Sequence, residues 1–151
     1  MRSTPTWLSA GLTCLFVIVL AAQTGSPKHK SILITRLYTG PDGQTHAEEI
    51  EAKFTAGSNS DVFKMMGIAG GEVHRAAPGT VIDWHTAPRR QYVITLSGHG
   101  ELEVAGGKKI SVGPGHIELA EDLTGKGHIT KVVGNEDRVT LQLPLLDQPG
   151  R

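Results

Sequence analysis

Cysteine is almost absent from this chain of 151 residues, in which Cys14 is the single example. Cys14 lies inside an N-terminal apolar segment that we expect to be removed. The mature protein would then contain no disulfide, no cysteine nucleophile and no thiolate ligand. All seven histidines follow this segment. Any transition-metal site must therefore be built from histidines and oxygen ligands.

An excess of charge of either sign is also missing. Lys and Arg together number 15, and Asp and Glu together number 15. The chain has neither a basic field that would gather nucleic acid nor an acidic tail. We therefore expect no nucleic-acid partner and favour a small organic molecule.

A hydrophobic run long enough to span a membrane comfortably is lacking as well. The apolar run "LSAGLTCLFVIVLAA" follows Arg2 and is shorter than the ~20 residues that a spanning helix needs. The small residues Ala21 and Ala22 then precede polar sequence. This order is typical of a secretory signal peptide over residues 1–22, with an uncleaved anchor as the alternative. We predict a secreted or periplasmic protein that has no membrane contact after cleavage.

Helical periodicity and GxGxxG phosphate loops are absent after Asp61. Short apolar runs alternate there with Gly, Pro, Asn and Asp, and each run has the length of a strand. About eight such runs indicate an all-β antiparallel sandwich or barrel. We predict a barrel over residues 61–146 and a C-terminal tail over residues 147–151.

The segment before the barrel is less regular. "SILITRLYTG" has the composition of a strand and is followed by the turn sequence "GPDG". "QTHAEEIEAKFTAG" comes next and is compatible with a short helix or an irregular connection. We predict that residues 23–60 form an N-terminal linker and an edge strand.

Two short motifs lie within the predicted barrel. In the first, five residues separate Gly79 from His85, and six separate Gln91 from Gly98. In the second, a "GPG" turn leads through a strand and the loop "AEDLTGKG" to His128. These spacings resemble the two motifs of the cupin superfamily, and the sequence is similar to small single-domain bacterial cupins of unassigned activity. The resemblance implies a cupin-type β-barrel (double-stranded β-helix, jelly roll) with its site in the barrel mouth.

The cupin resemblance also implies a set of metal ligands. The first motif normally supplies two histidines and a glutamate, but here Ala87 or Thr86 takes the place of the second histidine and Gln91 that of the glutamate. The implied ligands are His85, Gln91 and His128, and the implied cofactor is a divalent Zn, Mn, Ni or Fe ion.

Strand alternation places several polar side chains on the interior face. Asp83 shares a face with His85, and Arg89 shares one with Gln91, whereas Arg90 points away. We predict Asp83, His85 and Arg89 as catalytic residues, with Asp83 also a candidate anionic metal ligand. A histidine beside an aspartate can transfer a proton near neutral pH, and arginine can bind a carboxylate. The alternative for Asp83 is a structural ion pair with either arginine.

Two functions of different classes remain open. The first is a metal-assisted enzyme acting on a small molecule, namely a dioxygenase, isomerase or lyase. The second is a metal-free binding or sensing module that grips a carboxylate-type ligand through Arg89 and Gln91. A third, structural hypothesis is a homodimer, since the outward side chains of Tyr92 and Ile94 could pack against a second sheet or subunit.

Overall fold

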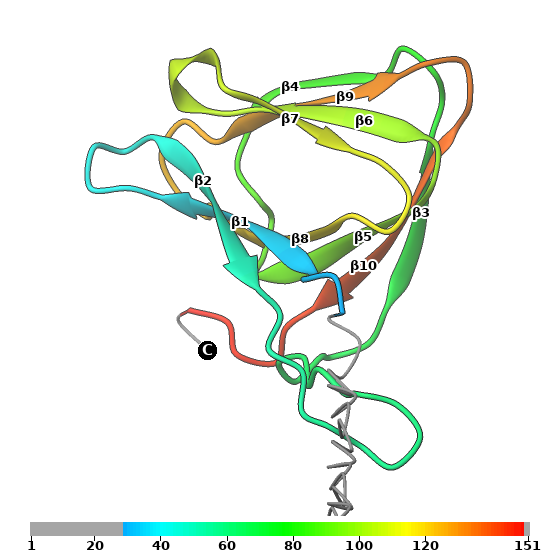
Figure 1. Cartoon of the computed structure of the whole chain (residues 1–151). Coiled ribbons are helices and arrows are strands. Elements are labelled where there is room, and N and C mark those ends of the chain that lie inside the picture. The colour runs from blue at the N-terminus through cyan, green and yellow to red at the C-terminus, as the bar shows by residue number, and fades with distance from the viewer. Residues whose placement is uncertain (1–28, 150–151) are drawn as a thin grey trace, which may run out of the picture. The chain divides into compact units, whose positions relative to one another are not determined.

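Ten strands in two sheets form the part of the chain that this computed structural model describes, residues 29–149 (Figure 1). The larger sheet has the order β2-β1-β8-β5-β10-β3 and the smaller one the order β4-β9-β6-β7. A short 3-10 helix, Ala105–Gly107, joins β6 to β7. The strand bounds are β1 Leu33–Thr39, β2 Thr45–Glu51, β3 Glu72–Ala76, β4 Val81–His85, β5 Gln91–Ser97, β6 His99–Glu103, β7 Lys109–Val112, β8 Ile117–Glu121, β9 His128–Val133 and β10 Arg138–Pro144. The all-β prediction is confirmed.

The pairing of the last eight strands is nested. β3 pairs with β10, β4 with β9, β5 with β8 and β6 with β7, and all four pairs are antiparallel. This arrangement is that of a jelly roll, in which the chain folds back on itself as one long hairpin wound into two sheets. The cupin-type architecture expected from the motifs is therefore present. The pairing of β1 with β8 is parallel.

The N-terminal hairpin is integrated into the larger sheet. Thr45–Glu51 is an edge strand that pairs along its whole length with β1, so neither the short helix nor the irregular connection expected there forms. The compact unit that contains both sheets begins at Ser31. The predicted signal peptide, residues 1–22, lies outside the described residues. Between residues 29 and 149, no helix is long and apolar enough to cross a membrane.

Two apolar clusters hold the sheets and their covering segment together. Tyr92 is buried in one cluster, on the face of β5 opposite to Gln91 and Val93. Partly buried Phe63, from the segment between β2 and β3, packs against this cluster. Part of the outer face of the large sheet is thus covered from within the chain. The buried members of this cluster are Ile34, Ala52, Tyr92, Leu119 and Leu145, and those of the other are Leu37, Leu102, Val104 and Val112.

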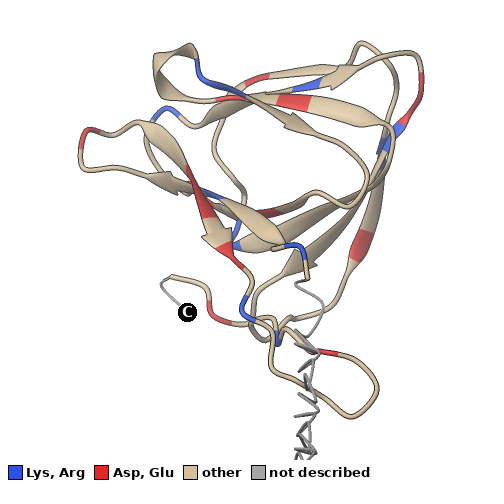
Figure 2. Ribbon diagram, viewed as in Figure 1, with Lys and Arg blue, Asp and Glu red and all other residues tan. Residues whose placement is uncertain are grey.

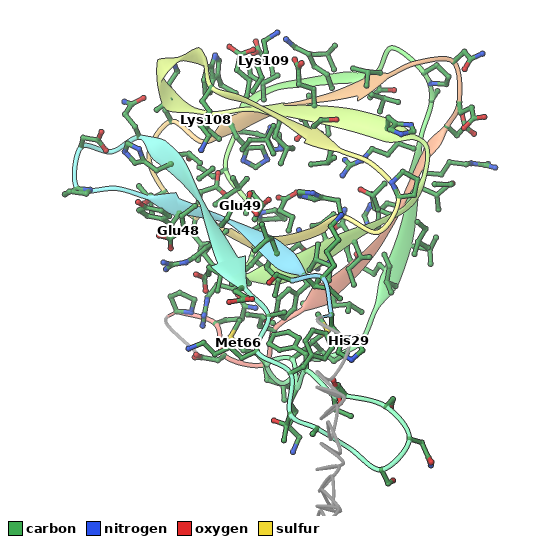
Figure 3. The ribbon with its side chains drawn as sticks, in the orientation of Figure 1. His29, Glu48, Glu49, Met66, Lys108 and Lys109 are labelled. Atoms are coloured by element: carbon green, nitrogen blue, oxygen red, sulfur yellow. The ribbon has the colours of Figure 1, made fainter. Side chains whose placement is uncertain are left out.

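Charged residues of both signs are spread over the ribbons of both sheets (Figure 2). One of them links the sheets. Lys108, which precedes β7, lies above the β1–β2 hairpin (Figure 3), and its Nζ donates to the backbone carbonyl of Ala47 at 3.1 Å.

Candidate active site

A cavity of about 340 Å³ lies within the barrel and receives side chains from both sheets. The predicted residues His85, Gln91 and His128 all line it. Its wall also contains titratable groups that the motifs did not indicate. Its polar and charged lining includes His85, Gln91, Glu118, His128, Arg138 and Thr140. Its apolar lining includes Ile82, Ala87, Val93, Leu102, Ala120 and Val132.

His85 and His128 lie side by side. The antiparallel register of β4 on β9 pairs these two residues directly, and their ring centroids are 4.3 Å apart. Gly127 permits this approach. Its φ is +77°, and a Cβ at that position would lie 2.0 Å from the carbonyl oxygen of His85. A side chain on residue 127 would therefore displace the end of β4.

The Nδ1 atom of each imidazole is held by an oxygen acceptor. Nδ1 of His85 donates to the backbone carbonyl of Asp83 at 2.8 Å. Nδ1 of His128 donates to Oδ2 of Asp122 at 2.6 Å, and both side chains of this pair are buried. Thr45 donates its hydroxyl to the same Asp122 oxygen at 3.1 Å. In His128 this leaves Nε2 as the ring nitrogen available for chemistry in the cavity.

The two histidines differ in basicity. Burial, assisted by the charge of His128, lowers the pKa of His85 despite the hydrogen bond to Asp83. Burial also opposes the charged form of His128, but the hydrogen bond and charge of Asp122 outweigh it and raise the pKa of His128. The site therefore pairs a weakly basic imidazole with a more basic one.

The side chain of Gln91 is oriented by a hydrogen bond from Arg89. Nε of Arg89 donates to Oε1 of Gln91 at 3.0 Å, and the NH2 group of the same guanidinium donates to Glu72 at 2.7 Å. Because arginine can only donate, the amide oxygen of Gln91 must face Arg89, which leaves the amide N–H groups for other partners. Arg89 itself is not among the side chains that line the cavity. Its contact with the site passes through Gln91.

Asp83 does not lie where strand alternation predicted. Its side chain is exposed and absent from the cavity wall, and its carboxylate accepts a hydrogen bond from the backbone N–H of Trp84 at 2.8 Å. The β4–β9 register shifts between Ile82 and His85, both of which line the cavity. This irregularity breaks the two-residue period, so Asp83 and His85 do not share the interior face. Neither predicted ion pair forms, since Arg89 pairs with Glu72 and Arg90 with Glu121 and Asp147.

Three charged residues of the cavity wall were missed, namely Arg75, which is exposed, and Glu118 and Arg138. Glu118 and Arg138 are both buried, with exposures of 4% and 7%. Burial raises the pKa of Glu118, although the charges of His128 and Arg138 act against this. The signal for Arg138 was present in "RVTLQL", where polar Arg138, Thr140 and Gln142 alternate with apolar residues. All three line the cavity, so the polar face of this strand is the interior one.

The donors present do not make up a complete metal site. Among the described residues, no group of three or more His, Cys, Asp or Glu side chains is placed to hold a metal ion. The remaining predicted ligand, Gln91, already directs its amide oxygen toward the guanidinium of Arg89. Arg138 adds a positive charge to the same cavity, which disfavours a cation.

Comparisons with family models and with curated proteins found no match. Among solved structures, an RmlC-like cupin protein from Desulfovibrio desulfuricans has a TM-score of 0.37 and 16% identity, over 53% of this chain and 80% of that one. The capsular polysaccharide assembling protein CapF from Staphylococcus aureus has a TM-score of 0.37 and 17% identity, over 66% of this chain and 32% of that one. On the nested pairing of its own strands and the place of its motif histidines, this chain is a cupin-type jelly-roll barrel.

Proposed function

We propose that this protein is a small-molecule enzyme that transfers protons within the barrel cavity, with His128 as the acid–base residue. The observation that carries the proposal is the buried hydrogen bond of 2.6 Å between His128 and Asp122 at the wall of the cavity. A carboxylate in this position fixes the tautomer of the imidazole and stabilises its protonated form. The reaction class is proton abstraction next to a carbonyl group, as in an isomerase or lyase.

The neighbouring residues supply complementary roles. The pKa of His85 is lowered and that of His128 is raised, so the pair offers two groups of different proton affinity to one substrate. The amide N–H groups of Gln91 are available to stabilise negative charge that develops on a substrate oxygen. Arg89 acts as a positioning residue for Gln91.

Hydrogen exchange into small carbonyl compounds tests this proposal. Pyruvate, 4-oxopentanoate, acetone and 2-butanone are incubated with the protein in D₂O, and loss of the signals of the protons next to the carbonyl is followed by ¹H NMR. Wild-type protein should accelerate exchange in at least one compound, and His128→Gln should remove the acceleration. His46→Gln is the matched control, because His46 forms an exposed pair with Asp42 at 3.0 Å. No acceleration by wild type, or an unaffected His128→Gln, would refute the proposal.

A metal-assisted reaction at His85, Gln91 and His128 is the second candidate. It is favoured by one observation, since both imidazoles direct Nδ1 to an oxygen acceptor, as metal-binding histidines commonly do. Elemental analysis of purified protein decides between the two. Near-stoichiometric Zn, Mn, Ni or Fe that is lost in His85→Ala and His128→Ala but kept in His46→Ala would favour the metal.

We also propose that the chain is exported and that the mature protein begins after Ala22. The N-terminal pattern of Arg2, an apolar run and small residues supports this. N-terminal sequencing of protein from an expressing bacterial host checks it. An intact N-terminus on the purified chain would favour the uncleaved anchor.

A further inference from the structure

We propose that Arg138 forms an anion subsite within the cavity and that the substrate of the proposed proton transfer carries a carboxylate bound there. This inference rests on the proposed function in one respect, that the bound carboxylate is called a substrate. The binding claim itself concerns Arg138 and is testable without turnover.

The guanidinium of Arg138 is buried and forms no ion pair with a carboxylate of the described residues. Its NH2 group donates to the hydroxyl of Thr95 at 3.0 Å, whereas its Nε is buried and has no hydrogen-bond partner. Among residues 29–149, no carboxylate forms an ion pair with it, although every other arginine of that range does so. Arg138 is only 7% exposed, and it lines the cavity. A buried cation in this state is costly unless a partner neutralises it.

Glu118 lines the same cavity as Arg138 but forms no ion pair with it. Burial lowers the pKa of Arg138, and the charge of Glu118 opposes this only in part. Burial favours the neutral form of Glu118, which can then donate a hydrogen bond instead of acting as the counter-ion. A ligand carboxylate would pair with the guanidinium and accept such a bond. Arginine presents a planar set of donors that suits this group.

The register of the strands sets the position of this subsite relative to His128. On β5 and β10, Gln91 pairs with Pro144 while Ser97 pairs with Val139, so Arg138 enters from the end of the barrel opposite to Gln91. Thr95, the hydrogen-bond partner of Arg138, lies four positions after Gln91 on β5, about 13 Å along a strand. His128 lies at the Gln91 end, because Gln91 pairs with Ala120 and the following Asp122 contacts His128. The ligand class is therefore an elongated carboxylate whose reacting group is remote from its carboxylate.

Binding of matched acids and amides tests the subsite. The probes are 4-oxopentanoate with 4-oxopentanamide and benzoate with benzamide, measured by calorimetry on the full chain. Wild type should bind at least one acid about tenfold or more tightly than its amide, since a hydrogen bond between charged groups is worth ~1.5–3 kcal/mol. Arg138→Gln should remove this preference. Arg36→Gln should keep it, because Arg36 lies outside the cavity wall and pairs with Glu48.

A measurement on the wild-type protein tests the subsite even if Arg138→Gln does not fold. The Nε–Hε NMR signal of Arg138 should shift saturably with the preferred acid and stay in place with its amide. Equal affinity for acid and amide in both pairs, or an unmoved Arg138 signal at saturation, would overturn the subsite. His128→Gln should retain the preference for the acid. Binding without any hydrogen exchange would therefore refute the proposed reaction alone, and exchange without acid preference would refute the subsite alone.

Discussion

The Nδ1 atom of His128 lies 2.6 Å from Oδ2 of Asp122, and the exposures of the two side chains are only 6% and 0%. His128 begins β9, and Asp122 follows β8 by one residue, so the six-residue separation closes the loop between the two sheets. This hydrogen bond thus connects the end of the β8 segment to β9 and orients the imidazole proposed to transfer protons. Its removal should lower both the free energy of unfolding and the pKa of His128.

Asp122→Asn tests this relationship. The substitution keeps the shape of the side chain but removes the charge that raises the pKa of His128. We expect the pKa of His128 to fall and the free energy of unfolding to decrease by about 1–3 kcal/mol. NMR titration of the imidazole and urea unfolding measure the two effects. Thr45→Val is the control, because Thr45 contacts the same oxygen at 3.1 Å without touching the imidazole contact. An unchanged His128 titration in Asp122→Asn would contradict the assignment.

Glu118→Gln should change how stability depends on pH. The folded pKa of Glu118 is raised above its ordinary value of 4.5, so unfolded chains release this proton at lower pH than folded ones do. Wild-type stability should therefore fall as pH rises from about 4.5 toward the folded pKa, by up to ~1.4 kcal/mol per pH unit. Glu118→Gln should lack this decline, and the two proteins should differ least at low pH. Urea unfolding across the pH range measures it, and parallel curves would show that Glu118 ionises normally.

Gly127→Ala should disturb the pairing of His85 with His128. The substitution adds strain at φ +77° and places a Cβ 2.0 Å from the His85 carbonyl oxygen. Gly106→Ala is the matched control, since its φ is +73° but nothing lies within 4 Å. We expect a loss of about 1–2 kcal/mol for Gly106→Ala and a larger loss for Gly127→Ala. Urea unfolding compares them, and equal losses would mean that the close approach to β4 is unimportant.

Leu37→Ala tests the packing of the β1–β2 hairpin onto the barrel. Leu37 is fully buried, at 0% exposure, in the cluster with Leu102 and Val112. We expect a loss of about 2–5 kcal/mol in the free energy of unfolding, from lost burial and a residual cavity. Leu96→Ala, at a side chain that is 50% exposed, should change it by less than ~0.5 kcal/mol. Similar small effects at both positions would show that packing of the hairpin contributes little to the free energy of unfolding.

Much of the site was predictable because motif spacing reports on strand length. The intervals around His85 and Gln91 correspond to β4 and β5, which bring these residues with His128 to one cavity. Asp83 could not be placed, because the register irregularity between β4 and β9 depends on pairing across the barrel and leaves no mark in a single strand. Arg138 was missed because an apolar interior was expected, whereas the interior face of β10 is the polar one.

The N-terminal hairpin shows a similar limit in the fold. "THAEEIE" has no clear alternation of polar and apolar residues, so a short helix and an irregular connection were the two expectations and a strand was not. Its conformation is decided by β1, with which it pairs over seven residue pairs, and by the hydrogen bond between Arg36 and Glu48 at 2.8 Å. Tertiary pairing of this kind outweighs local propensity.

Hydrogen exchange in the presence of a chelator is the most direct test of the central claim, that His128 supported by Asp122 transfers protons without a metal. The protein is treated with EDTA, dialysed, and assayed in D₂O with the compound that wild type exchanges fastest. We predict exchange at the untreated rate, and loss of exchange in His128→Gln but not in His46→Gln. Loss of exchange on chelation that added Zn, Mn, Ni or Fe restores would contradict the account.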